Sequence, residues 1–482
     1  MRIPQLRRTA KFSDEQETRN VAFVLFCMFI VSYFLHLTQR VGLLGVIHFD
    51  LLLASATALA IAFARPRRQA RGRPAGALPE QMEPATLRLW ILVAYIFVTL
   101  PFVEWPGSVL HNLETFAKSI CFFFFVIATV DSTRKLKWLL AVYVFTQLFR
   151  VLEPLAMHVT SGYWGGRASV GNWESIDRLS GSPWDVINAN GLGFVIIMTL
   201  PLLQFLCRPD TPVRRVLWGA AACAMCYALV LSASRSSFLG FLFLVVVVIW
   251  RSKHRAAWLA VAVLGAIVAL SLLTGQEKDR YRSIVSSTAP GAGTAQGRIA
   301  GVISDFKVTL RRPLFGHGLG TSAEANAHFS KNWLISHDLY TETAQELGYV
   351  GLALLLALIW SFIRASQVAQ RITSAVGTGD ERLQFLRAVA RSLVVVVAVD
   401  LFYSFAAYGL SEPYWYFYGG LTVVTARLAI KLAPDTSRDD AAALAAGRAR
   451  RSSGGRGAGR APVRGRVPTA VRNVRATPLG RI

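Results

Sequence analysis

Three polar residues stand beside apolar segments and have the chemistry of a group-transfer site. Arg235 lies in the serine-rich stretch SASRSS before an apolar run, Arg298 in GRIAGVISDFKVTL (297–310), and His337 in SHDLYTETAQELGYVG (336–351). A guanidinium binds two phosphate oxygens at once, and a neutral imidazole accepts a proton from a hydroxyl near neutral pH. The sequence therefore predicts an anion clamp and a general base for a sugar hydroxyl.

The two arginines, and the nearby Glu346, also have ordinary interpretations. Arg235 could be a snorkelling residue that sets topology, and Arg298 could be a solvated arginine in the first turn of an amphipathic helix. Glu346 could orient a partner of the site or only cap the start of a helix. Gly318, with its neighbours in PLFGHGLGTS (313–322), predicts a loop that allows close approach of other groups.

The elements that must position these residues are membrane helices. Hydrophobic residues make up 53% of the 482-residue chain and charged residues 17%, against roughly 25% charged in soluble domains. Apolar segments of about 20 residues, enough to cross a bilayer, recur along it. We predict an all-α polytopic membrane protein with about twelve transmembrane helices. The predicted spans are 21–38, 41–63, 87–103, 116–130, 136–157, 186–206, 213–231, 236–250, 256–274, 341–363, 389–410 and 414–431.

The basic loops predict how the chain is oriented. With residues 1–20 in the cytoplasm, clusters of Arg and Lys fall in every cytoplasmic loop, as the positive-inside rule requires. The two long polar loops, 158–185 and 275–340, then face the outside, together with the three candidate site residues. An even number of spans returns the C-terminus to the cytoplasm. We expect a multi-pass protein of the cytoplasmic membrane.

The C-terminal tail, residues 434–482, is rich in Arg, Gly and Ala, a composition that predicts disorder. It contributes much of the net charge of +24. We expect it to bind anionic lipid head groups and not nucleic acid, because no aromatic or folded module accompanies it. Nucleotide-binding and zinc motifs are absent from the sequence, so we expect neither a metal nor another cofactor.

The order of these features resembles the O-antigen ligase and polymerase superfamily of bacterial membrane glycosyltransferases. The resemblance is strongest over about 230–363 and includes INANGLGFVIIMTLPLL (187–203), which gives a ligase-like core over about 186–363. It implies a GT-C-like transmembrane domain over 21–433. The loop over 275–340 would be periplasmic and would contain an amphipathic helix.

The resemblance also implies the substrates and the roles of residues. The donor would be a glycan on a polyprenyl (undecaprenyl) diphosphate carrier, with no obligatory metal. Arg235 and Arg298 would bind the diphosphate, and His337 would assist deprotonation of the acceptor hydroxyl. Asp338 replaces the asparagine of the family's usual His-Asn pair; it weakens any role that needs a neutral amide, and it could raise the basicity of the histidine.

Three functions remain open from the sequence. A ligase would move a finished glycan to lipid A-core or to a protein, and a polymerase would join lipid-linked repeat units of O-antigen or exopolysaccharide. The loops 158–185 and 275–340 would set the acceptor. The alternative class is a transporter or flippase for a lipid-linked or anionic solute, for which Asp50 and Asp400 are intramembrane acids.

Overall fold

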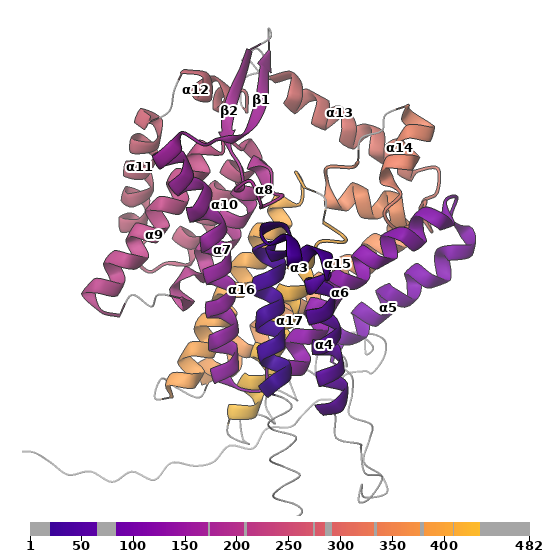
Figure 1. The fold of residues 1–482 in the computed structure, drawn as a ribbon, viewed down its shortest axis with the longest axis horizontal. Helices are drawn as coiled ribbons and strands as arrows, with labels where there is room; N and C mark the ends of the chain where they lie inside the picture. The colour runs from indigo at the N-terminus through magenta and orange to yellow at the C-terminus, as the bar shows by residue number, and fades with distance from the viewer. Residues whose placement is uncertain are drawn as a thin grey trace, which may run out of the picture. The chain divides into compact units, whose positions relative to one another are not determined.

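The computed structural model describes residues 20–64, 83–171, 174–206, 210–272, 275–284, 292–331, 335–375, 380–407 and 409–433. Helices dominate this part of the chain, and a single two-stranded hairpin is its only sheet (Figure 1). The all-α prediction is therefore confirmed apart from that hairpin. The N-terminal residues 1–19 and the predicted disordered tail, 434–482, lie outside the described residues.

The N-terminal segment is divided more often than its apolar sequence suggests. The first helix, Asn20–Phe34, is followed by α2 (Leu37–Arg40), α3 (Gly42–Val46) and α4 (Phe49–Ala64). His36 and His48 take left-handed backbone conformations, with φ of 49° and 48°, which ends a right-handed helix. The predicted spans 21–38 and 41–63 are thus shorter helices joined by turns.

The next helices have start and stop signals that the sequence carries. They are α5 (Pro84–Thr99), a 3₁₀ turn η1 (Leu100–Phe102), α6 (Pro106–Thr129) and α7 (Thr133–Ser161). Proline stands in the first turn of α5 and of α6, where its missing N–H costs nothing. Ser132 caps α7 by accepting from the backbone N–H of Lys135.

A short hairpin follows α7. Strands β1 (Gly165–Gly171) and β2 (Glu174–Leu179) pair antiparallel, with Arg167 opposite Asp177. The chain then forms α8 (Ala189–Thr199), a 3₁₀ segment η2 (Leu200–Phe205), α9 (Pro212–Leu231), α10 (Arg235–Arg251) and α11 (Arg255–Leu272).

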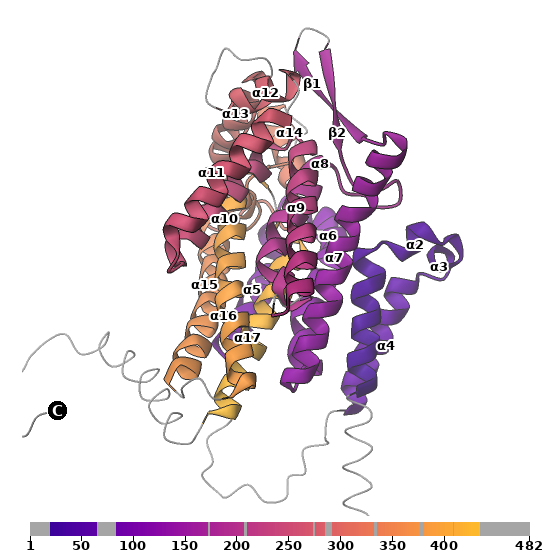
Figure 2. The same cartoon turned by 90° about the vertical axis from the view of Figure 1, so that its left-hand side faces the viewer.

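Three helices after α11 lie at the same end of the helix bundle as the hairpin, as Figures 1 and 2 both show. They are α12 (Gly275–Arg282), α13 (Ala292–Thr309) and α14 (Ser322–Ser330). Helix α13 begins before the predicted 297, because AGTAQG already forms helix, so Arg298 is in its second turn and not its first. Its apolar stripe is exposed at Ile299, Ile303, Phe306 and Leu310, and its predicted contact with the membrane surface stays a prediction.

Three C-terminal helices complete the bundle: α15 (Leu339–Ala375), α16 (Glu381–Tyr403) and α17 (Pro413–Leu432). Helix α17 is buried along most of its length and packs against α6, α15 and α16. Helix α15 is broken at Gly348, which has φ of 69°. A Cβ there would lie 2.2 Å from the carbonyl oxygen of Leu314, so the loop before α14 passes this point because glycine occupies it.

Five helices of the described residues are long and apolar enough to cross a bilayer. They are Pro84–Phe102, Pro106–Thr129, Thr133–Ser161, Pro212–Leu231 and Leu339–Ala375, and shorter apolar helices are Asn20–Phe34, Phe49–Ala64 and Ala189–Phe205. The chain thus has the helices of a membrane protein, while the number of about twelve spans stays a prediction.

Candidate functional site

The turn between α9 and α10 carries the first candidate residue. Ala233 in this turn has a left-handed backbone with φ of 44°, which is uncommon for a residue with a Cβ. Ser234 then caps α10 by accepting from the backbone N–H of Ser237. Arg235, the first residue of α10, is half-buried and donates from Nη1 to the hydroxyl of Ser283 at 2.7 Å.

The asparagine-containing start of α8 supports the same turn. Asn188 caps α8, and the side-chain oxygen of Asn190 accepts from the hydroxyl of Ser234 at 2.9 Å. The same oxygen of Asn190 accepts from Nη2 of Arg178 in β2 at 2.8 Å. The segment 187–203 is therefore joined to the serine-rich turn.

Two arginines that sequence reasoning missed lie at this turn. Arg178 of β2 donates from Nε to the carbonyl oxygen of Ser232 at 2.9 Å, and Arg280 of α12 donates from Nε to that of Ala233 at 2.8 Å. Burial and the charge of Arg280 lower the pKa of Arg178 to about 10. Burial and the charge of Arg235 lower the pKa of Arg280 to about 10.

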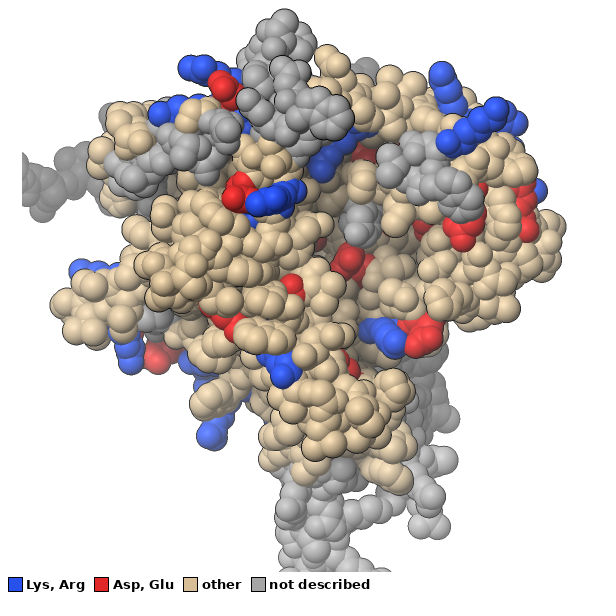
Figure 3. All heavy atoms as spheres, turned by 45° about the horizontal axis from the view of Figure 1, so that its top comes forward, with Lys and Arg blue, Asp and Glu red and all other residues tan. Residues whose placement is uncertain are grey.

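Arg298 brings a fourth guanidinium to the cluster. It is exposed on α13, and its charge repels those of Arg178, Arg235 and Arg280. Within the part of the chain that the structure describes, no carboxylate forms an ion pair with Arg178, Arg280 or Arg298. Figure 3 looks toward this end of the molecule, where basic side chains gather around a hollow that contains acidic ones.

His337 is linked to the cluster through α13. It lies in the segment before α15 and is exposed. Partial burial of the ring and the positive charge of Arg298 lower the pKa of His337, and the carboxylate of Asp305 opposes them. Arg298 and Asp305 are seven residues apart, which is two turns of helix and the same face. One face of α13 thus presents a cation and an anion toward the histidine.

Asp305 is held by a chain of amides. The amide nitrogen of Asn326 donates to Asp305 at 2.8 Å, and the amide nitrogen of Gln345 donates to the oxygen of Asn326 at 2.7 Å. All three residues are buried. Burial raises the pKa of Asp305, while its hydrogen bonds from Ser336 and Asn326 act in the opposite direction. Sequence reasoning missed Asp305, although its spacing from Arg298 was a usable signal.

Asp338 lies next to His337 but acts on the helix. Its Oδ1 accepts from the backbone N–H groups of Tyr340 and Thr341, both at 2.9 Å, as a helix cap does. Burial raises the pKa of Asp338. The carboxylate that raises the pKa of His337 is that of Asp305. The predicted effect of Asp338 on the basicity of His337 stays a prediction.

Glu346 and Gly318 hold the glycine loop against α15. Glu346 is buried and accepts at Oε2 from the backbone N–H of Gly320 at 2.7 Å. The N–H of Gly318 donates to the carbonyl oxygen of Glu346 at 2.8 Å. Gly318 has φ of 121°, and a Cβ there would lie 2.5 Å from Val109. These contacts fix the glycine loop against α15, and the supporting role of the two residues at the site stays a prediction.

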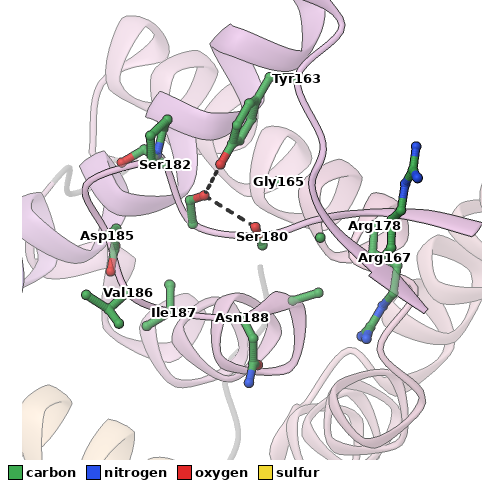
Figure 4. Close-up of a pocket in the computed structure, with 14 residues that line it drawn as sticks. Tyr163, Gly165, Arg167, Arg178, Ser180, Ser182, Asp185, Val186, Ile187 and Asn188 are labelled. Atoms are coloured by element: carbon green, nitrogen blue, oxygen red, sulfur yellow. Dashed lines mark hydrogen bonds between the residues drawn. The ribbon is translucent and has the colours of Figure 1, made fainter.

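A polar pocket opens beside the hairpin. It has a volume of about 310 Å³ and is lined by 14 residues of the segment 163–189, among them Arg178 (Figure 4). The ring of Tyr163 stands over it, and its hydroxyl donates to the carbonyl oxygen of Gly181 at 2.7 Å. Arg178 thus belongs both to this pocket and to the arginine cluster. Among the described residues, no group of three or more His, Cys, Asp or Glu side chains could hold a metal ion.

A comparison with families of known proteins gives a match to part of the chain. The sequence profile of the O-antigen ligase family matches residues 220–356. This range contains Arg235, Arg298 and His337, and it leaves Arg178 outside. No curated protein matches the chain.

Proposed function

We propose that this chain, a bacterial membrane protein that belongs to the O-antigen ligase and polymerase superfamily through residues 220–356, transfers a glycan from a polyprenyl diphosphate carrier to an acceptor hydroxyl. The observation that carries the proposal is the position of Arg298. It lies close enough to both Arg235 and His337 for its positive charge to lower the pKa of each. This supports a site at one end of the helix bundle in which an anion clamp and a proton acceptor act together. We assign that end to the outer face of the cytoplasmic membrane, with both termini in the cytoplasm.

The reaction needs little from the protein beyond charge, position and a base. The acceptor oxygen attacks the anomeric carbon of the donor sugar, and the bond from that carbon to the diphosphate oxygen breaks. Arg235 and Arg298 stabilise the negative charge that develops on the leaving diphosphate, and His337 takes the hydroxyl proton. Because its pKa lies below the usual value, His337 is neutral and able to act near pH 7. Binding both substrates at one site supplies the remaining advantage.

The acceptor distinguishes the two reactions that this site suits. A ligase would use lipid A-core or a protein, and a polymerase would use a second lipid-linked glycan. We assign recognition of sugars to the segment 163–189, whose pocket of about 310 Å³ has polar walls and the ring of Tyr163. We favour the ligase and keep polymerisation of lipid-linked repeat units as the alternative.

A surface-glycan gel tests the proposal. We compare a deletion strain with the same strain carrying wild type, His337→Ala or His328→Ala at matched protein levels. His328 is exposed on α14, in the same long loop, and serves as the matched control. We expect the deletion and His337→Ala to lack long glycan on its acceptor and His328→Ala to be normal. Long chains on the carrier lipid then indicate a ligase, and single repeats indicate a polymerase.

Transport of a lipid-linked or anionic solute is the second candidate. One observation favours it: Asp400 of α16 is buried, and among the described residues its Oδ2 has no hydrogen-bond partner. Buried intramembrane acids often mark ion paths. Asp50 is less exceptional, because it accepts from the hydroxyl of Ser32 at 2.5 Å. A normal glycan ladder in the His337→Ala strain, with loss of the ladder in Asp400→Asn, would favour transport.

A further inference from the structure

The backbone before Arg235 is held by arginines from two other segments of the chain. Arg178 comes from the hairpin and Arg280 from α12, and each binds a carbonyl oxygen of the turn through Nε. Only 8% of Arg178 and 7% of Arg280 are exposed. The two side chains therefore converge on Ser232 and Ala233, beside the start of the helix that carries Arg235.

Both guanidiniums keep nitrogen atoms available. The hydrogen bonds that described residues make with Arg280 use only its Nε, and those with Arg178 use Nε and Nη2. No carboxylate among the described residues pairs with either side chain. A buried cation without a counter-charge is costly. Together with Arg235 and Arg298, these residues form a cluster that an anion from outside the fold would stabilise.

The turn itself is strained. Ala233 has φ of 44°, a conformation that glycine adopts far more easily than alanine. Strained backbone persists where the surroundings impose it, and it collects at functional sites. Here the surroundings are the two Nε donors, which fix the carbonyl oxygen atoms of the two peptide units that flank Ala233.

We propose that Arg178 and Arg280 are two further ligands of the donor diphosphate, each fixing a carbonyl of the turn with Nε and presenting Nη nitrogen atoms to phosphate oxygens. This inference rests on the proposed function. With Arg235 and Arg298 it gives the site four guanidiniums, which suits a diphosphate better than a monophosphate. The site would therefore discriminate between undecaprenyl diphosphate and undecaprenyl monophosphate by charge.

Lysine is the informative replacement. Arginine can donate from Nε and from its Nη atoms at the same time, whereas lysine has one nitrogen at the end of a flexible chain. Lysine keeps the charge but cannot hold the carbonyl and contact a phosphate in the same geometry. Arg282→Lys is the matched control, because Arg282 is two residues from Arg280, its side chain is 75% exposed and it pairs with Asp279.

The experiment measures the binding of both lipids to the purified full chain by native mass spectrometry in detergent. We expect Arg178→Lys and Arg280→Lys each to weaken undecaprenyl diphosphate binding by about tenfold or more. Binding of undecaprenyl monophosphate should fall less, and Arg282→Lys should bind both lipids like wild type. Equal losses for the two lipids, or wild-type affinity in both variants, would overturn the inference.

A second variant separates ligand binding from support of the turn. Ala233→Gly relaxes the strained backbone, so the pair Ala233→Gly with Arg280→Lys should restore affinity if Arg280 only holds the turn. We expect no restoration, and full restoration would refute the role of Arg280 as a ligand. Arg298→Gln reports on the proposed function alone. If wild type shows no preference for the diphosphate lipid and Arg298→Gln binds like wild type, the diphosphate donor itself is wrong.

Discussion

Two groups of buried arginine in this molecule have opposite electrostatic surroundings. Arg150 of α7 is 2% exposed and forms a two-pronged ion pair with Asp185, at 2.7 and 3.0 Å, with further hydrogen bonds to Gln147 and Tyr414. Arg178 and Arg280 are nearly as buried, yet their charged neighbours are other arginines. The first group has its counter-charge within the fold, whereas the described residues supply no carboxylate for the second, which is why we propose an anion as its partner.

The presence or absence of a paired carboxylate distinguishes buried arginines that stabilise the fold from those proposed to bind a ligand. A paired cation holds helix to loop, because Asp185 lies in the segment before α8 and Arg150 in α7. An unpaired cluster raises the energy of the folded chain until an anion binds. Selection for stability alone would not retain such a cluster, so its presence between the hairpin and α12 supports the proposed binding site.

The largest expected effect comes from removing a cation of the arginine cluster. Arg235→Gln and Arg298→Gln should each lower the rate of glycan transfer about 10²- to 10³-fold, because each donor stabilises charge on the leaving diphosphate. The rate is measured with purified protein and a lipid-diphosphate-linked glycan. Arg282→Gln removes an exposed cation of the same loop and should leave the rate unchanged. A loss below about tenfold in both site variants would contradict the anion clamp.

Breaking the paired group should affect folding instead. Arg150→Met leaves the carboxylate of Asp185 buried without its main partner, and we expect it to destabilise the protein by about 3–5 kcal/mol. Arg280→Met should destabilise the protein much less, because it also removes repulsion between Arg280 and the neighbouring arginines. Thermal unfolding in detergent measures both variants. The comparison fails if Arg280→Met is the more destabilised of the two.

The dependence on pH tests the link between α13 and His337. The neutral imidazole is the active form, so the transfer rate rises as the pH increases through the pKa of His337. Asp305 raises that pKa, so Asp305→Asn should lower it and move the acidic limb of the rate profile to lower pH. Asparagine can still accept the hydrogen bond from Asn326, which keeps the geometry.

Lys307→Gln is the control for this pH measurement, because Lys307 is an exposed cation on the same helix. We expect its acidic limb to match that of wild type. An unchanged limb in Asp305→Asn, or a limb moved to higher pH, would show that Asp305 does not control the protonation of His337.

Local sequence was enough to propose three candidate site residues. Arg235 was proposed because it begins an apolar run, Arg298 because it lies on an amphipathic helix, and His337 because it precedes a membrane helix. Each signal is contained in a few consecutive residues. Asp305 was within reach of the same reasoning, since it shares a helix face with Arg298.

The remaining site residues depend on contacts between distant segments. Arg178 lies two residues after Ile176 in β2, so the two share a face and are both buried, but the hairpin was not predicted. Arg280 lies in a short polar helix that nothing in the sequence connects to Ala233. The break at Gly348 was also hidden, because the apolar pattern continues through it and only the contact with the loop at Leu314 requires it.

The smallest expected effect concerns Asp338, which lies beside the site but serves the scaffold. Asparagine caps helices as well as aspartate does, so Asp338→Asn, which restores the asparagine of the family's usual pair, should leave stability, rate and pH profile close to wild type. Asp338→Ala should cost about 1 kcal/mol of stability through loss of the cap. If Asp338→Asn instead moved the acidic limb to lower pH, Asp338 would be raising the basicity of His337. Asp338 would then belong to the site as well as to the scaffold.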